Sequence, residues 1–175
     1  WYGFWNHYAT YGRNAKHMYD LAEAQDNDAL RAIALTFKVL FFSNMTDMFG
    51  SIPYEEAFLG RELGGTLTPK FNTQKEVYEF MFADLELAND IYASNPVFLK
   101  SEMDGMYGGN MAAWRKFNTS LYLRLLMRVS GRAEMNVGTR MTALVTNPDK
   151  YPLFTSNADN ATVKFTGTDP YISNF

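Results

Sequence analysis

The sequence predicts a mainly all-α protein of tetratricopeptide-like helical hairpins, with long ordered loops and little or no strand. Four long segments carry apolar residues at steps of three and four, the spacing of one helix face. Capping residues and glycines bound these segments. The 175 residues are 47% hydrophobic and 20% charged and contain no cysteine, which suits one globular domain and excludes disulfide scaffolds and thiolate metal sites. We therefore treat residues 1–175 as a single helical domain.

The first two predicted helices form a hairpin. The first runs from Trp1 to about Gln25, and the second carries an apolar stripe from Leu30 to Met48. Between them, Asp26, Asn27 and Asp28 supply side chains that can cap the second helix. Gly50 ends that helix and Pro53 prevents its resumption. Because the connection is short, we expect the two helices to be antiparallel neighbours with a shared core.

A third helix is predicted after a long ordered loop over residues 51–72, which contains three glycines and two prolines. Thr73 and Glu76, three residues apart, form a capping box at its start. The helix ends before Asn95 and Pro96, because the residue before a proline avoids the helical conformation.

A fourth helix is predicted from about Met111 to Ser130, after a loop rich in Gly and Asp, and Gly131 closes it. The pattern weakens beyond that point. We expect a short fifth helix around Val137 to Thr146 and at most one short strand at residues 161–165, where apolar and polar residues alternate.

Several functional classes find no support in the sequence. The net charge is −3 and the 16 basic residues are scattered, which argues against a nucleic-acid partner. The longest apolar runs, 35–42 and 121–127, fall far short of the roughly 20 residues of a membrane span. No nucleophile elbow, phosphate loop, dinucleotide motif or zinc-protease motif is present. We therefore predict a non-enzyme without a cofactor.

Metal binding has little support. His7 and His17 are ten residues apart and lack the spacing that puts two ligands on one helix face. Two polar groups could in principle hold a cation: one on the first helix, and one in an oxygen-rich loop. For both, a solvated helix face or a simple turn is the more economical interpretation. The groups are His17, Asp20 and Glu23, and Asn157, Asp159 and Asn160.

Carboxylates leave one enzymatic alternative open. A glycosidase needs two facing carboxylates, and two groups in the chain could supply them. We interpret both as solvated charge, because one lies in a loop beside a proline and the other on a helix whose opposite face is apolar. The two groups are Glu55 with Glu56, and Asp84 with Glu86 and Asp90.

Aromatic residues gather at the start of the chain more densely than one helix face can bury. Tyr2 and Trp5 lie about 300° apart around a helix, so some rings must face away from the core. Sugar rings stack on aromatic faces and hydrogen-bond to nearby amides. We therefore take Trp1, Tyr2, Trp5 and Asn6 as the candidate ligand-binding residues. The alternative is that these rings pack against a domain outside the chain.

Two stretches resemble the SusD/RagB family. The first is Thr46–Ala57 followed by a helix that opens with Glu76, Val77 and Tyr78. The second runs from Tyr107 to Ser130 and contains Trp114-Arg115-Lys116-Phe117, with Asn118-Thr119-Ser120 as a small departure from the family pattern. Arg115, Lys116, Arg124 and Arg128 need partners or solvent, and we expect Arg124 or Arg128 to pair with acidic groups on neighbouring helices.

The resemblance implies a fragment of a larger outer-membrane lipoprotein of Bacteroidetes-type bacteria that is exposed at the cell surface. Such a protein captures glycans or other nutrients without catalysis and works with a SusC-type TonB-dependent transporter. Its contact with the membrane would be a lipid anchor outside this chain. The family motifs do not fix the ligand contacts, so the four candidate residues rest on the aromatic excess alone. The alternative function is a helical-repeat scaffold for protein–protein interaction, and an enzyme of glycan breakdown ranks third.

Overall fold

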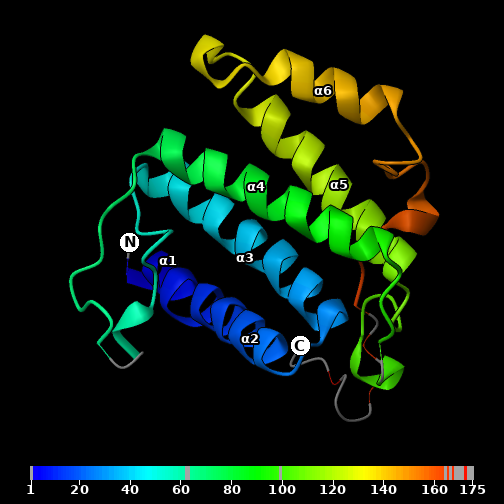
Figure 1. Cartoon of the computed structure of the whole chain (residues 1–175), viewed down its shortest axis with the longest axis horizontal. Helices are drawn as coiled ribbons and strands as arrows, with labels where there is room; N and C mark the ends of the chain where they lie inside the picture. Colours follow the sequence, from blue (N-terminus) through cyan, green and yellow to red (C-terminus); the bar gives the residue numbers. More distant parts are fainter. Residues whose placement is uncertain are drawn as a thin grey trace.

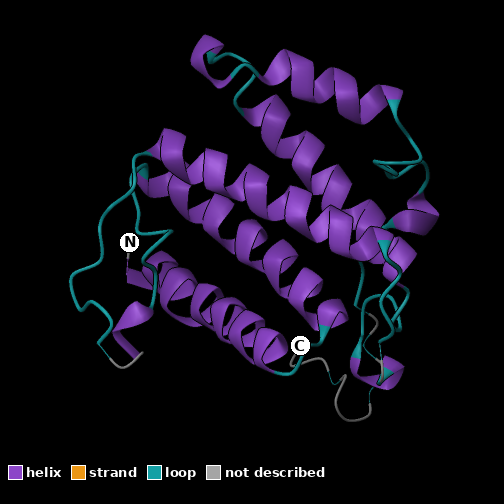
Figure 2. Cartoon of the chain, viewed as in Figure 1, coloured by secondary structure: helices purple, strands orange, loops and turns teal. Residues whose placement is uncertain are grey.

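The computed structural model describes residues 2–61, 64–98, 100–163, 165, 167 and 172. Helices dominate this part of the chain, and it contains no strand beyond one isolated antiparallel bridge between Ile52 and Asn72 (Figures 1 and 2). The α-helices are α1 (Tyr2–Asn6), α2 (Arg13–Ala24), α3 (Asp28–Phe49), α4 (Gln74–Ala93), α5 (Met111–Arg128) and α6 (Val137–Thr146). The prediction of a mainly all-α fold is confirmed.

From α2 onward, successive helices pack side by side and reverse direction at each connection (Figure 1). α2 contacts α3, α3 contacts α4, α4 contacts α5, and α5 contacts α6. α3 also reaches α5, so α3 is the central element of the stack. This order is that of tetratricopeptide-like hairpins, as the sequence predicts.

The first predicted helix is helical along its length but not uniform. A π-helical turn, His7–Gly12, joins α1 to α2, and both junctions keep helical backbone angles. Gly12 lies where α2 comes closest to α3, since a Cβ atom at this position would stand 2.9 Å from the ring of Phe42. The glycine therefore permits the close approach of the first two helices.

α3 begins and ends as the sequence predicts. The side chain of Asn27 accepts a hydrogen bond from the backbone N–H of Leu30 and caps the helix. Gly50 ends it with φ of 72°, and its N–H donates to the carbonyl of Thr46 at 2.8 Å. Among the described helices, α3 alone is long and apolar enough to cross a membrane, yet 56% of that stretch is buried in the fold. Its composition is accounted for by its central position.

The loop between α3 and α4 is held by Asn72, which is fully buried. Its side-chain oxygen accepts from the backbone N–H groups of Tyr54 and Glu55, at 3.0 and 3.2 Å. Its backbone pairs with Ile52 in both directions. α4 then starts with the predicted capping box of Thr73 and Glu76. Asn72 therefore ties the two ends of this loop together, and the prediction of an ordered loop holds for its described residues, 51–61 and 64–72.

The core forms two clusters on either side of a buried polar network. One cluster surrounds Phe42, Phe82 and Tyr122, and the other surrounds Ile33 and Trp114. Asn118 on α5 is fully buried between them. It accepts from the hydroxyl of Thr36 on α3 at 3.0 Å and donates to the carbonyl of Leu85 on α4 at 2.9 Å. One amide thus ties three helices together.

Asp84 differs from its predicted state as solvated charge. Its side chain is only 21% exposed and accepts hydrogen bonds from Lys38 Nζ at 2.9 Å and from the Tyr54 hydroxyl at 2.7 Å. Glu86 also has a partner, since it accepts from the hydroxyl of Tyr151. The helix pattern could not predict these contacts, because Lys38, Tyr54 and Tyr151 come from other parts of the chain.

After α5, the described residues form one further α-helix and short 3-10 turns. α6 has the predicted bounds, and the described residues of 161–165 form no strand; Lys164 and residues 168–171 and 173–175 lie outside the described part. Residues 157–159 form a short 3-10 turn capped by Ser156. Asp159 pairs with Lys116 at 2.8 Å. Hydrogen bonds from Lys116 and from backbone N–H groups lower the pKa of Asp159, so this loop is a turn held by an ion pair.

Candidate functional site

The predicted ligand-binding residues lie at the start of the helical stack, beside the end of α3. Trp5 and Asn6 are on α1 and reach solvent. Tyr2 begins α1, and Trp1 lies outside the described residues. Trp5 and Asn6 are therefore on the surface, where a ligand can reach them.

Trp5 combines an exposed edge with a firm support. Its side chain is 36% exposed. One face stacks on Tyr8, with ring centroids 5.0 Å apart, and Phe49 meets it edge-on at 5.3 Å. Tyr8 is itself buried and donates a hydrogen bond to the carbonyl of Pro53 at 3.1 Å. The indole is therefore held in place while part of it stays accessible.

A cleft of about 340 Å³ lies nearby, lined by residues from α1, the π-helical turn, the end of α3 and the end of α5. We call it the N-terminal cleft. Phe4, which is 51% exposed, and Met48, which is 42% exposed, form its apolar wall. His7 and Asn44 add polar groups, and both are exposed. Its lining is Phe4, His7, Asn44, Met45, Asp47, Met48 and Arg128.

Asp47 anchors the floor of this region. One of its carboxylate oxygens accepts from the Tyr78 hydroxyl at 2.6 Å, and the other accepts from Arg128 Nε at 2.9 Å. Burial, followed by the hydrogen bond to Asp47, raises the pKa of Tyr78, so the phenol stays protonated and donates. The expected pairing of Arg128 with a neighbouring helix is confirmed. α3, α4 and α5 are therefore joined where the cleft is built.

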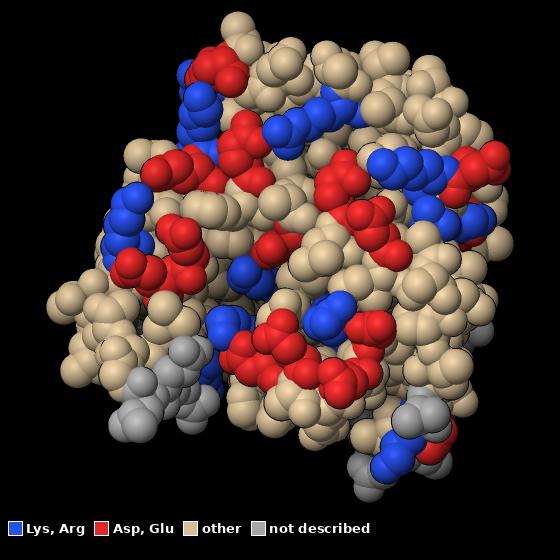
Figure 3. All heavy atoms as spheres, viewed as in Figure 1, with Lys and Arg blue, Asp and Glu red and all other residues tan. Residues whose placement is uncertain are grey.

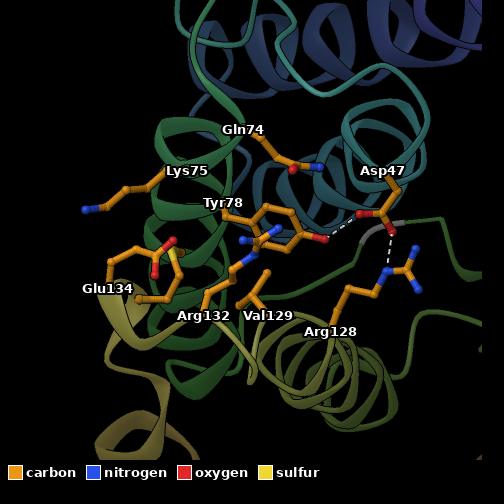
Figure 4. A pocket seen from close by; sticks show the side chains of 9 residues that line it. Asp47, Gln74, Lys75, Tyr78, Arg128, Val129, Arg132 and Glu134 are labelled. Atoms are coloured by element: carbon orange, nitrogen blue, oxygen red, sulfur yellow. Dashed lines mark hydrogen bonds and ion pairs between the residues drawn. The ribbon is translucent and has the colours of Figure 1, made fainter.

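A second hollow of about 290 Å³ lies on the other side of this ion pair (Figure 4). We call it the cationic pocket because three of its lining side chains are Lys or Arg. Side chains from the end of α3, the start of α4, and the end of α5 with the following loop surround it. They are Asp47, Gln74, Lys75, Tyr78, Arg128, Val129, Arg132, Glu134 and Met135.

The lining of the N-terminal cleft has the chemistry of a binding site. Exposed aromatic and thioether surface beside an amide, an imidazole and a guanidinium suits a sugar, whose ring faces are apolar and whose edges are polar. The described residues contain no group of three or more His, Asp or Glu placed to hold a metal ion.

The other polar groups noted in the sequence have local partners. Asp20 pairs with Lys16 at 2.6 Å, and Glu23 accepts from the hydroxyl of Tyr19. Glu56 accepts from the backbone N–H of Lys70 at 2.7 Å. These contacts stabilise the helix and the loop in which the residues lie.

Sequence reasoning missed part of the cleft. Asn44 is not among the residues that the sequence predicts for the site, and Met48 ends the apolar stripe of the second predicted helix, yet both are exposed. They are four residues apart on α3, so they share one helix face with each other. Phe37 and Phe41 continue this face along α3 but are partly buried, and Phe37 packs against Trp114, so exposure begins only at the end of the helix.

Comparison with known families gives the identity of the fold. Residues 2–175 match the SusD-like family model, which is described as starch-binding and associating with the outer membrane. The chain belongs to the SusD-like family. The resemblance predicted from the two sequence motifs is therefore confirmed, and the family is one of binding proteins of the bacterial outer membrane rather than of enzymes.

Solved SusD-like structures share this fold. A SusD homologue from Bacteroides fragilis superposes with a TM-score of 0.81 at 27% identity, over 94% of this chain and 34% of that one. A second from the same species gives 0.75 at 32% identity, over 93% and 33%. A structure described as a chitin-binding protein gives 0.73 at 28% identity, over 91% and 33%. The chain spans about a third of the length of these proteins. A search of curated proteins found no match.

Proposed function

We propose that this SusD-like chain takes part in the non-catalytic capture of oligosaccharides at the outer-membrane surface. The carrying observation is the family match over residues 2–175, whose description combines starch binding with the outer membrane. A similar structure described as a chitin-binding protein shares the fold, which supports a glycan as the class of ligand. The protein would pass its ligand to a SusC-type TonB-dependent transporter and be held at the membrane by a lipid anchor outside this chain.

The N-terminal end of the stack supplies a place for the sugar. Phe4 and Trp5 are adjacent in sequence and point about 100° apart around α1, so they present two apolar surfaces to neighbouring parts of a chain of sugars. Asn6 and Asn44 are exposed beside them and can bond to ring hydroxyls. We therefore propose Trp5 and Asn6, together with Phe4 and Asn44, as ligand contacts. Trp1 and Tyr2 stay predictions.

The proposal includes no catalytic step because two candidate carboxylates are already bonded to other side chains. Asp47 in the cleft is bonded to Tyr78 and Arg128, and Asp84 to Lys38 and Tyr54. A carboxylate that is engaged by side chains from other helices or loops suits a structural role better than that of a proton donor to a ligand.

Retention and chain-length analysis test this proposal together. Native gels containing amylopectin or soluble chitin oligosaccharides should retard the protein, while chromatography of the same sugars after incubation should show unchanged chain length. Shortened sugars would support the enzymatic alternative. Full mobility in every glycan gel, with a pull-down of the transporter intact, would favour a scaffold for protein–protein interaction.

A further inference from the structure

The cationic pocket contains positive charge that the fold does not neutralise. Lys75, Arg128 and Arg132 line it together with Asp47 and Glu134, which leaves one net positive charge. Within the part of the chain that the structure describes, no ion pair joins Lys75 or Arg132 to an acidic residue, whereas Arg128 pairs with Asp47. Two of the three cations that line the hollow therefore have no ion-pair partner among the described residues.

No interaction within α4 stabilises the positive charge of Lys75. It lies in the first turn of α4, where the positive end of the helix dipole disfavours a cation. Its neighbour at i+4, Glu79, is engaged by Arg140 at 2.7 Å. Arg128, in contrast, lies in the last turn of α5, where the dipole favours a cation. An external anion would supply the partner that Lys75 lacks.

The pocket adjoins the N-terminal cleft. Asp47 and Arg128, which form an ion pair, line both hollows, so the two hollows are neighbours. Tyr78 and Met135 are almost fully buried beneath the cationic pocket. An extended ligand can therefore place one unit against Phe4 and Met48 and the next beside Arg132 and Lys75.

We propose that the cationic pocket binds the carboxylate or sulfate group of an acidic oligosaccharide whose adjoining ring lies in the N-terminal cleft. This inference rests on the proposed function and names its substrate class. The guanidinium of Arg132 presents a planar pair of donors that matches the two oxygens of either group, and Lys75 adds a mobile point charge. In Figure 4, the Arg132 guanidinium lies in front of the Tyr78 ring, between the Asp47–Arg128 pair and Lys75, whose side chain extends outward at the rim of the pocket.

Titration calorimetry with two matched sugar pairs tests the proposal. The probes are tetragalacturonate with its methyl ester, and a sulfated galactan tetrasaccharide with its desulfated form. Wild type should bind at least one acidic sugar about tenfold more tightly than its neutral partner, and more weakly as salt rises. The variant Lys75→Gln/Arg132→Gln should lose that tenfold preference. The matched control, Arg13→Gln/Lys100→Gln, removes the same charges from exposed positions that line neither hollow and should keep it.

The outcomes separate this inference from the proposed function. Equal binding within both sugar pairs, or an acidic preference that survives in Lys75→Gln/Arg132→Gln, overturns the anion site while capture of neutral glycans still stands. If no glycan of any charge binds, the proposed function fails and this inference fails with it. Circular dichroism and thermal unfolding of both double variants establish that folding is unchanged, since all four side chains are exposed.

Discussion

Asp84 gives the sharpest prediction about stability, because one carboxylate holds two partners from elsewhere in the chain. Lys38 is only 15% exposed, and its Nζ lies 2.9 Å from Asp84 and 4.2 Å from the centre of the Tyr54 ring. The substitution Asp84→Asn keeps the shape and an acceptor for the Tyr54 hydroxyl but removes the negative charge. It therefore isolates the electrostatic part of this contact.

The expected cost follows from the burial of Lys38. Breaking a buried ion pair costs about 3–5 kcal/mol, because the remaining charge stays desolvated. Asp84 is 21% exposed, so we place the loss for Asp84→Asn at the lower end, about 3 kcal/mol. For a chain of this size, 1 kcal/mol corresponds to roughly 2–4 °C, so the melting temperature should fall by about 6–12 °C.

Urea unfolding and calorimetry measure this loss, and two further variants identify its cause. Lys38→Met/Asp84→Asn removes both charges and should recover about 1–2 kcal/mol relative to Asp84→Asn alone. Asp20→Asn breaks the Lys16–Asp20 pair, whose carboxylate is 42% exposed, and should cost under about 0.5 kcal/mol. A loss below about 1 kcal/mol for Asp84→Asn, or no recovery in the double variant, would refute the reasoning.

Three further predictions concern single positions. Asn118→Ala should cost about 2–4 kcal/mol in urea unfolding, because it removes buried hydrogen bonds to the Thr36 hydroxyl and the Leu85 carbonyl and leaves a cavity between three helices; a loss under 1 kcal/mol would contradict the network. Gly50→Ala should cost about 1–2 kcal/mol from its φ of 72° alone, since no atom lies within 4 Å of the added Cβ; an unchanged urea midpoint would count against it. Burial opposes ionisation of Asp104, but hydrogen bonds from Trp114 and backbone N–H groups prevail and lower its pKa. The ionised Asp104 therefore stabilises the fold above about pH 4, and this stabilisation is lost as the pH falls below that value. Between pH 6 and pH 3, Asp104→Asn should lose less stability than wild type.

Local signals in the sequence account for most of the fold. Asn27, Gly50 and the capping box of Thr73 and Glu76 act within a few residues, so the helix ends they set could be read directly. The π-helical turn at 7–12 has no such local signal. The partners of Asp84 are likewise set by tertiary packing, since Lys38 and Tyr54 are 46 and 30 residues away.

The candidate site was predicted only in part. The aromatic excess drew attention to Trp5 and Asn6, which do lie on the surface. It did not reveal the N-terminal cleft, because Asn44 and Arg128 come from helices that meet α1 only in the folded chain. Met48 was assigned to the core because an apolar residue on a central helix carries no mark of which face it occupies. Packing of α3 against three neighbours decides that question.

The central claim is that a sugar binds at the N-terminal cleft. The most direct test is to choose a neutral glycan that the wild type binds and to titrate it by calorimetry into wild type, Phe4→Ala and Phe165→Ala. Both phenylalanines are more than half exposed, but only Phe4 lines the N-terminal cleft. Loss of a stacking ring should weaken binding by about tenfold, or ~1.4 kcal/mol, in Phe4→Ala. Phe165→Ala should bind as wild type does. Equal affinity for all three proteins would contradict capture of the sugar at the start of the helical stack.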